Sequence, residues 1–164
     1  MISFRTACAL GFLACVGLMA YALYAQHGLG LEPCPLCIFQ RVSVIATGVV
    51  FLLAALHGPA GAGRWLYAGL AALSASIGAG IAGRHVWLQS LAPEDVPACG
   101  PGLDYMLEAF PLQQVLRRVF SGSGECAQID WTFLGLSMPA WTLICFIGLA
   151  LSALAIPLLS RPRT

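Results

Sequence analysis

Residues 7–24 read ACALGFLACVGLMAYALY, an apolar run without a single charged side chain. A helix needs about 20 mostly apolar residues to cross the hydrocarbon core of a bilayer. Three further stretches meet this condition, at about residues 38–56, 65–83 and 139–159. Backbone polar groups in lipid must bond within their own segment, so each stretch predicts a transmembrane helix. The sequence therefore predicts an all-α membrane protein, a four-helix bundle in one domain over residues 1–164.

The composition agrees with this class and excludes several others. Hydrophobic residues make up 59% of the chain and charged residues only 9%, whereas soluble domains carry about 25% charged residues. So few charges exclude both an ordinary soluble enzyme and a disordered chain. The eight basic residues are scattered arginines and the net charge is +1, which excludes a nucleic-acid partner.

The placement of the arginines predicts the orientation in the membrane. One side of the predicted bundle carries no acidic residue but four arginines, which are Arg5, Arg64, Arg161 and Arg163. All seven acidic residues fall on the other side. The excess of arginine marks the cytoplasmic side, so both termini should be cytoplasmic. Two loops then face outward, at about residues 26–37 and 85–138.

Two features of the spans have alternative interpretations. Residues 20–22, Ala-Tyr-Ala, resemble a signal-peptide cleavage site, but the apolar run before them exceeds the usual ~7–15 residues, so we expect the span to be retained. In the third span, small residues recur every fourth position and predict close helix packing rather than a merely alanine-rich helix. They are Ala68, Ala72, Ser76 and Gly80, with Ala71, Ala75, Ala79 and Gly83 beside them.

The seven cysteines fall into two groups. Within apolar spans, where a thiol behaves as a small inert hydrophobe, lie Cys8, Cys15 and Cys145. On the outward side lie Cys34, Cys37, Cys99 and Cys126. An even number of cysteines facing an oxidising compartment predicts two disulfides. A zinc site would need two close-spaced ligand pairs, and only one pair is close, so no metal site is predicted.

The Cys34-Pro35-Leu36-Cys37 motif predicts a redox couple at the start of the second span. So small a ring adds little loop-closure entropy, whereas the two-residue spacing and a helix start favour a thiolate. Arg41 follows Cys37 by one helical turn, and its permanent charge on the same face stabilises that thiolate. The alternative is that Arg41 merely extends towards the headgroups. An ionisable residue within a span and beside a thiol favours the functional interpretation.

The long loop leaves three questions open. Cys99 and Cys126 can form either a structural disulfide that holds the loop or a labile disulfide that exchanges with a partner protein, and their spacing favours neither. His85, placed at the start of this loop and at the depth of Cys37, is either a proton or ligand contact or an ordinary headgroup-level residue. Residues 112–120 have an apolar face at helical spacing and predict a short interfacial helix, with packing on the loop as the alternative.

If both cysteine pairs cycle, electrons taken from a reduced dithiol must pass to an acceptor. The sequence has no haem, flavin or nucleotide motif. The natural acceptor dissolved in a bilayer is quinone, and the charge of Arg41 would stabilise negative charge on a reduced ring.

Several motifs, taken together, resemble the DsbB family of bacterial inner-membrane proteins that form disulfides with quinone. The resemblance covers nearly the whole chain. It rests on Pro33-Cys34-Pro35-Leu36-Cys37 with Arg41, His85-Val86-Trp87-Leu88-Gln89, Cys99, Ser123-Gly124-Glu125-Cys126-Ala127 and Trp131-Thr132-Phe133-Leu134-Gly135-Leu136-Ser137-Met138-Pro139. It implies an inner-membrane, multi-pass protein with ubiquinone or menaquinone as cofactor and redox cysteines facing the periplasm.

The same resemblance implies roles for individual residues. Cys34 and Cys37 would be the quinone-coupled pair, with Cys37 meeting the quinone. Arg41 and His85 would lie at the quinone ring.

The loop pair would then exchange. Cys99 would form a mixed disulfide with a reduced DsbA-like periplasmic protein of thioredoxin fold, and Cys126 would be its disulfide mate. Two other functions remain alternatives: a non-enzymatic scaffold with two structural disulfides, which would not need Arg41, and an outward electron relay, which would need a cytoplasmic thiol pair that the sequence lacks.

Overall fold

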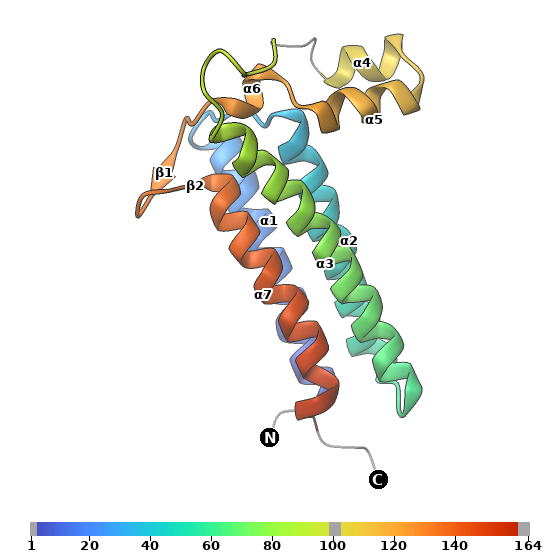
Figure 1. The fold of residues 1–164 in the computed structure, drawn as a ribbon. Coiled ribbons are helices and arrows are strands. Elements are labelled where there is room, and N and C mark those ends of the chain that lie inside the picture. Colours follow the sequence, from blue (N-terminus) through green and yellow to red (C-terminus); the bar gives the residue numbers. More distant parts are fainter. Residues whose placement is uncertain (1–2, 99–102, 161–164) are drawn as a thin grey trace.

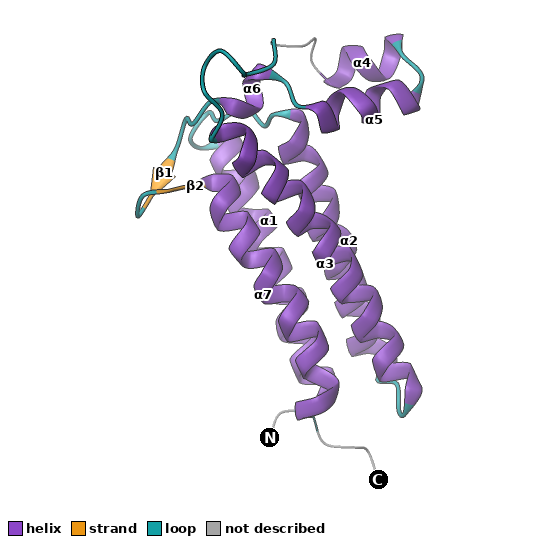
Figure 2. Ribbon diagram, in the orientation of Figure 1, coloured by secondary structure: helices purple, strands orange, loops and turns teal. Residues whose placement is uncertain are grey.

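A computed structural model describes residues 3–98 and 103–160 (Figure 1). Four long helices are each apolar and long enough to cross a membrane. They are α1 (Phe4–His27), α2 (Pro35–His57), α3 (Ala62–Gln89) and α7 (Met138–Leu159). They form an up-and-down bundle, and most of the chain is helical (Figure 2). The prediction of an all-α four-helix membrane bundle is confirmed.

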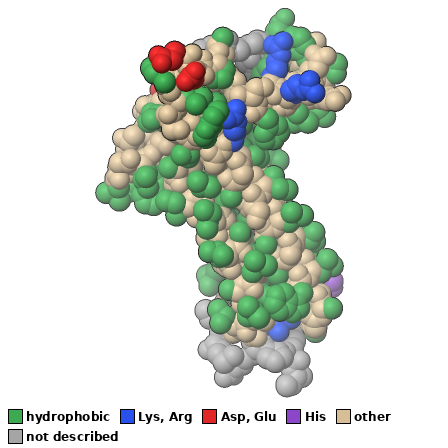
Figure 3. Space-filling model, viewed as in Figure 1, with side chains coloured by type: hydrophobic (Ala, Val, Ile, Leu, Met, Phe, Trp, Pro, Cys, Tyr) green, Lys and Arg blue, Asp and Glu red, His purple; other side chains and the backbone are tan. Residues whose placement is uncertain are grey.

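The smaller elements gather at one end of the bundle (Figure 1). They are α4 (Leu103–Ala109), α5 (Leu112–Ser121), α6 (Gly124–Ala127), β1 (Thr132–Phe133) and β2 (Leu136–Ser137). In the view of Figure 3, acidic side chains are visible at this same end. The functional site lies here, between the ends of the long helices and the short elements.

Local sequence explains where the long helices begin and end. The Ser3 hydroxyl accepts a bond from the Thr6 amide and caps α1. Pro35 occupies the first turn of α2, where its missing N–H costs nothing. Gly58 ends α2 in the left-handed conformation, with φ of 57°.

The third helix is longer than the sequence predicted. It continues to Gln89, six residues beyond the predicted end of the apolar span. Hydropathy falls at Arg84 and His85, but no proline follows until Pro93, so the backbone has no reason to leave the helix. His85 therefore lies on a helix rather than at the start of a loop.

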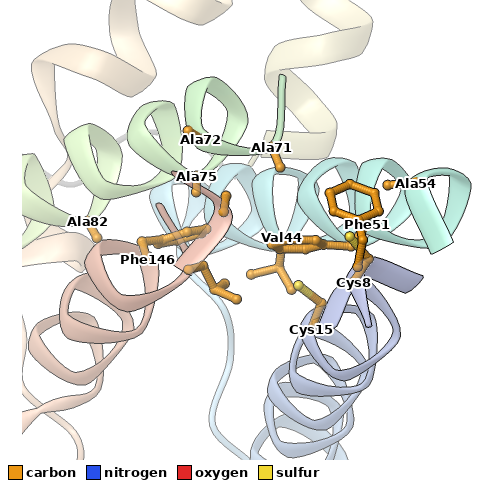
Figure 4. Close-up of a cluster of buried hydrophobic side chains, with 13 residues drawn as sticks. Cys8, Cys15, Val44, Phe51, Ala54, Ala71, Ala72, Ala75, Ala82 and Phe146 are labelled. Carbon is orange, nitrogen blue, oxygen red and sulfur yellow. The ribbon is translucent and has the colours of Figure 1, made fainter. Parts of the chain in front are cut away.

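Small side chains let α3 pack closely on α2 and α7. Its buried face comprises Ala68, Ala71, Ala72, Ala75, Gly78, Ile81 and Ala82. The close-up in Figure 4 shows several of these alanines beside Phe146, with Cys8 and Cys15 in the same cluster. The predicted stripe at every fourth residue is only partly right, because Ser76 and Gly80 are exposed. A helix turns once in 3.6 residues, so a strict four-residue stripe drifts away from the contact.

Gly78 offers a sharp test of this packing. A Cβ at Gly78 would lie 2.4 Å from the ring of Phe146, which is itself buried. We expect Gly78→Ala to lower the free energy of unfolding by about 1–3 kcal/mol through overpacking. Gly80→Ala is the matched control, because a Cβ at Gly80 has no neighbour within 4 Å. Thermal unfolding of both variants in one detergent checks this, and equal melting temperatures would contradict the packing described.

The helix α5 covers the end of the bundle. Val115 and Val119 are buried against Leu36 and Leu88, and the guanidinium of Arg84 donates to the carbonyls of residues 120 and 121 at the end of α5. Two of the five residues of the apolar face thus pack on the ends of α2 and α3 and on the loop residue Met106, whereas the alternative interpretation expected packing on loop residues alone. Leu112 and Phe120 remain exposed, and a position at the membrane surface stays a proposal.

A two-residue hairpin before α7 was not predicted. Strands β1 and β2 pair antiparallel, and Leu134 and Gly135 at the turn have φ of 51° and 78°. Two positive φ values at adjacent turn residues are typical of a tight type I′ hairpin. The indole of Trp141 donates to the Phe133 carbonyl at 3.0 Å and fastens the hairpin to α7.

Candidate redox site

The CxxC motif straddles the first turn of α2. Cys34 is the N-cap residue, outside the helix, and Cys37 lies inside it. The Cys34 thiol donates to the Cys37 sulfur at 3.2 Å. The pair is therefore close enough to form and break a disulfide with only a small movement. Unpaired amides at the helix start favour negative charge on Cys37.

His85 reaches this pair from α3. Its side chain is 3% exposed, with Nε2 lying 3.8 Å from the Cys34 sulfur and Nδ1 lying 4.0 Å from the Cys37 sulfur. The buried amide nitrogen of Gln40 lies 3.2 Å from Nδ1. When Gln40 donates to Nδ1, the neutral ring carries its proton on Nε2, towards Cys34. The ring is thus oriented to exchange a proton with a sulfur.

Cys126 approaches the same pair from the outer loop. It is buried in α6, where its thiol lies 3.6 Å from the Ser123 hydroxyl and close enough to Cys34 to interact with it. The interaction with Cys34, together with burial, raises the pKa of the Cys126 thiol. A thiol of high pKa is a strong nucleophile once it loses its proton. Its predicted mate Cys99 lies outside the described residues.

Arg41 turns towards α1. Its guanidinium donates to the side-chain oxygen of Gln26 and, at 3.1 Å, to the Ala22 carbonyl. It lies within electrostatic range of Cys37. An arginine held in this way by two acceptors on a neighbouring helix differs from one that extends freely to the headgroups.

A cavity of about 600 Å³ connects these groups. Polar groups, including Cys37, Arg41 and His85, occupy part of its wall. Apolar side chains of α1 and α7 form much of the rest, among them Leu18 and Trp141. A largely apolar chamber with a few convergent polar groups is typical of a small-molecule site.

Some contributors were missed by the sequence interpretation. Gln40 and Gln26 carry no motif, although an uncharged polar residue in or beside an apolar span is itself a signal. Cys145, predicted to be an inert core thiol, lines the cavity instead. Cys8 and Cys15 are buried in the core, as expected.

Gln40 should act as a positioning residue for His85. We expect Gln40→Leu to reduce kcat for disulfide formation about tenfold, which corresponds to roughly 1.4 kcal/mol. The pH profile of kcat should also shift, because the buried imidazole loses the partner that selects its tautomer. Ser43→Ala is the control, since Ser43 is also buried in α2 but its hydroxyl donates to the Phe39 carbonyl of the same helix and not to His85. An unchanged pH profile in Gln40→Leu would show that Gln40 is merely structural.

Three convergent cysteines beside a buried histidine, at one end of a membrane bundle, define an integral-membrane thiol–disulfide oxidoreductase. The family model described as "Disulfide bond formation protein DsbB" matches residues 4–156. The chain belongs to the DsbB family, and it is an enzyme of this oxidoreductase family.

Relatives called "Disulfide bond formation protein B" support the same family assignment. The protein of Methylococcus capsulatus is 60% identical over 147 residues, covering 90% of each chain. That of Chromohalobacter salexigens is 57% identical, covering 92% of this chain and 88% of its own. That of Hahella chejuensis is 52% identical, covering 97% of this chain and 96% of its own.

Proposed function

We propose that this protein reoxidises a DsbA-like periplasmic thiol oxidase and passes the electrons to membrane quinone, ubiquinone or menaquinone. It would do so as one integral domain in the bacterial inner membrane. Both termini would be cytoplasmic and the redox cysteines periplasmic. One observation carries the proposal: Cys126 lies within interaction range of Cys34, while Cys37, the other sulfur of the CxxC pair, lines a largely apolar cavity together with Arg41.

The first exchange would take place in the outer loop. A thiolate of the reduced partner attacks Cys99 of a Cys99–Cys126 disulfide. The partner–Cys99 bond forms, and the Cys99–Cys126 bond breaks with its electron pair on Cys126. The second thiolate of the partner then displaces Cys99 and leaves as the oxidised disulfide.

The second exchange would transfer electrons inward. The Cys126 thiolate attacks the Cys34 sulfur, so a Cys34–Cys126 bond forms while the Cys34–Cys37 bond breaks. The electron pair leaves on Cys37. Attack by Cys99 on Cys126 then restores the loop disulfide and leaves Cys34 reduced. The charge of Arg41 favours this direction, because it stabilises a thiolate on the leaving Cys37.

The residues around Cys37 would serve its reoxidation. Bound quinone supplies an acceptor for two electrons and two protons. Arg41 stabilises negative charge at the polar end of the cavity, and the apolar walls exclude water from it. His85, with Nε2 towards Cys34, carries a proton to or from the sulfur.

The proposal also places α5 at the outer membrane surface. Its exposed Leu112 and Phe120 would contact the lipid, and Arg117 and Arg118 would face the headgroups. This position would hold α6, and therefore Cys126, at the depth of the CxxC pair.

A coupled assay tests the proposed function. The full chain is reconstituted in lipid with ubiquinone and given a reduced DsbA-like protein, and quinone absorbance and partner thiols are followed together. We expect one quinone reduced for each partner disulfide formed, and without quinone no thiol loss beyond the one-time oxidation of partner by the protein's own two disulfides. The assay is repeated with menaquinone. If the protein melts cooperatively but turns over with neither quinone, the proposal is overturned and a scaffold is favoured.

A further inference from the structure

The site collects the ligand set of a zinc centre from three separate elements. One atom each from Cys34, Cys37 and His85 lie within 4.8 Å of one another. Cys126 lies beside this group and interacts with Cys34, but its sulfur is not among the atoms that lie within 4.8 Å of one another, so it would have to move closer to become the fourth donor. Three cysteines and one histidine are a common structural zinc set. The spacing of these residues along the chain does not predict such a group, because the donors come from α2, α3 and α6.

The distances suit a tetrahedral ion. Bonds of about 2.3 Å to sulfur and about 2.0 Å to nitrogen place neighbouring ligand atoms roughly 3.5–3.8 Å apart. The two sulfurs of the CxxC pair are 3.2 Å apart, and Nε2 of His85 is 3.8 Å from the Cys34 sulfur. Movements of a few tenths of an ångström would therefore accommodate zinc at Cys34, Cys37 and His85, and a larger approach of Cys126 would complete the set.

The surroundings also complete such a centre. A metal-bound histidine usually donates its other N–H to a fixed acceptor. With Nε2 on the ion, Nδ1–H would face Gln40, whose amide can rotate to present its oxygen. Three thiolates and a divalent cation leave one negative charge, which Arg41 offsets on the cavity wall.

We propose that the fully reduced site binds a thiophilic divalent cation, zinc in the first place, through Cys34, Cys37, Cys126 and His85. Binding displaces protons from the thiols, one from each of three, and no electron is transferred. A disulfide at Cys34–Cys37 removes two ligands, so metal binding and the oxidised state exclude each other. Zinc would thus arrest the protein in its reduced form and act as a redox-gated inhibitor.

Cobalt and zinc titrations test this without quinone or partner. Full-length protein in lipid nanodiscs is reduced, and cobalt is added while the visible bands of tetrahedral thiolate-bound cobalt are recorded. Chelator competition then gives the zinc affinity. We expect one ion for each reduced chain and no bands for the oxidised protein. Bands of equal intensity in the oxidised protein, or none in the reduced protein, would overturn the proposal.

Variants test the assignment of the ligands. Cys37→Ser and His85→Ala should each weaken zinc binding by at least about 100-fold. Cys145→Ser should not, although Cys145 lines the same cavity. Cys99→Ser should also retain binding, and loss of binding in that variant would overturn the four-ligand set. Cooperative melting is checked for each variant, and Cys37→Ser serves if His85→Ala fails to fold.

This inference rests on side-chain geometry rather than on the proposed electron path. If the protein binds zinc as described but reduces no quinone, only the proposed function fails. If it turns over with quinone but never binds cobalt through thiolates, only the present inference fails.

Discussion

A Cys37→Ser variant is expected to lose disulfide-forming turnover on the order of 10³-fold or more, because it removes the sulfur that, in the proposed function, carries electrons from Cys34 to the cavity. Cys34 stays within interaction range of Cys126. The variant should therefore accumulate a Cys34–Cys126 disulfide when reduced protein is exposed to a mild oxidant. Steady-state oxidation of a reduced DsbA-like protein gives the rate, and peptide mass mapping gives the linkage.

Cys15→Ala is the matched control for this variant. It also removes a thiol, but one that is buried in the core cluster at α1 and does not line the cavity. We expect its turnover to stay within about twofold of the wild type, with some loss of stability. If Cys37→Ser keeps more than a tenth of the wild-type rate, Cys37 is not the sulfur that reduces the acceptor.

An Arg41→Met variant is expected to lower kcat/KM for quinone about 100-fold, the effect of removing one preorganised charge from a largely apolar site. Methionine fills a similar volume but neither stabilises a thiolate nor bonds the acceptors on α1. The rate is measured against quinone concentration, and thermal unfolding is followed in parallel. A large loss of rate without a matching loss of stability is the expected result.

Arg41→Lys separates the charge from the hydrogen bonds. Lysine keeps the positive charge but cannot reproduce the fork that reaches both Gln26 and the Ala22 carbonyl. We expect a loss of about tenfold, between wild type and Arg41→Met. If both variants lose the same activity, the hydrogen bonds that hold the guanidinium in place, rather than its charge, account for the effect of Arg41.

Hydropathy was sufficient to predict the bundle, because a helix in lipid must satisfy its own backbone. Hydropathy failed to predict structure where polar residues continue a helix. The last turns of α3 carry Arg84 and His85, so hydropathy ended the span there although the backbone remained helical to Gln89. The β1–β2 hairpin was missed because so short a turn leaves almost no pattern.

Sequence spacing predicted the neighbours that share a helix, but not those that packing brings together from different helices. Cys34, Cys37 and Arg41 lie on one helix, so spacing alone placed them near one another. The contacts of His85 and Cys126 depend on how α3 and α6 pack against α2, which spacing does not encode. Gln40 had no motif at all, and its role became visible only through its bond to His85.

The length of α3 determines the depth in the membrane at which His85 lies, and so where electron transfer and proton exchange would take place. Its 28 residues extend roughly 42 Å at 1.5 Å per residue, whereas the hydrocarbon layer is about 30 Å thick. Part of the helix must therefore stand in the headgroup zone, and its C-terminal turns carry His85. At that depth the buried side chain of His85 lines the apolar cavity, near the level where the bilayer meets water. In the proposed function, electrons would leave laterally into the membrane, while protons would be exchanged with the aqueous phase along the axis of the bundle.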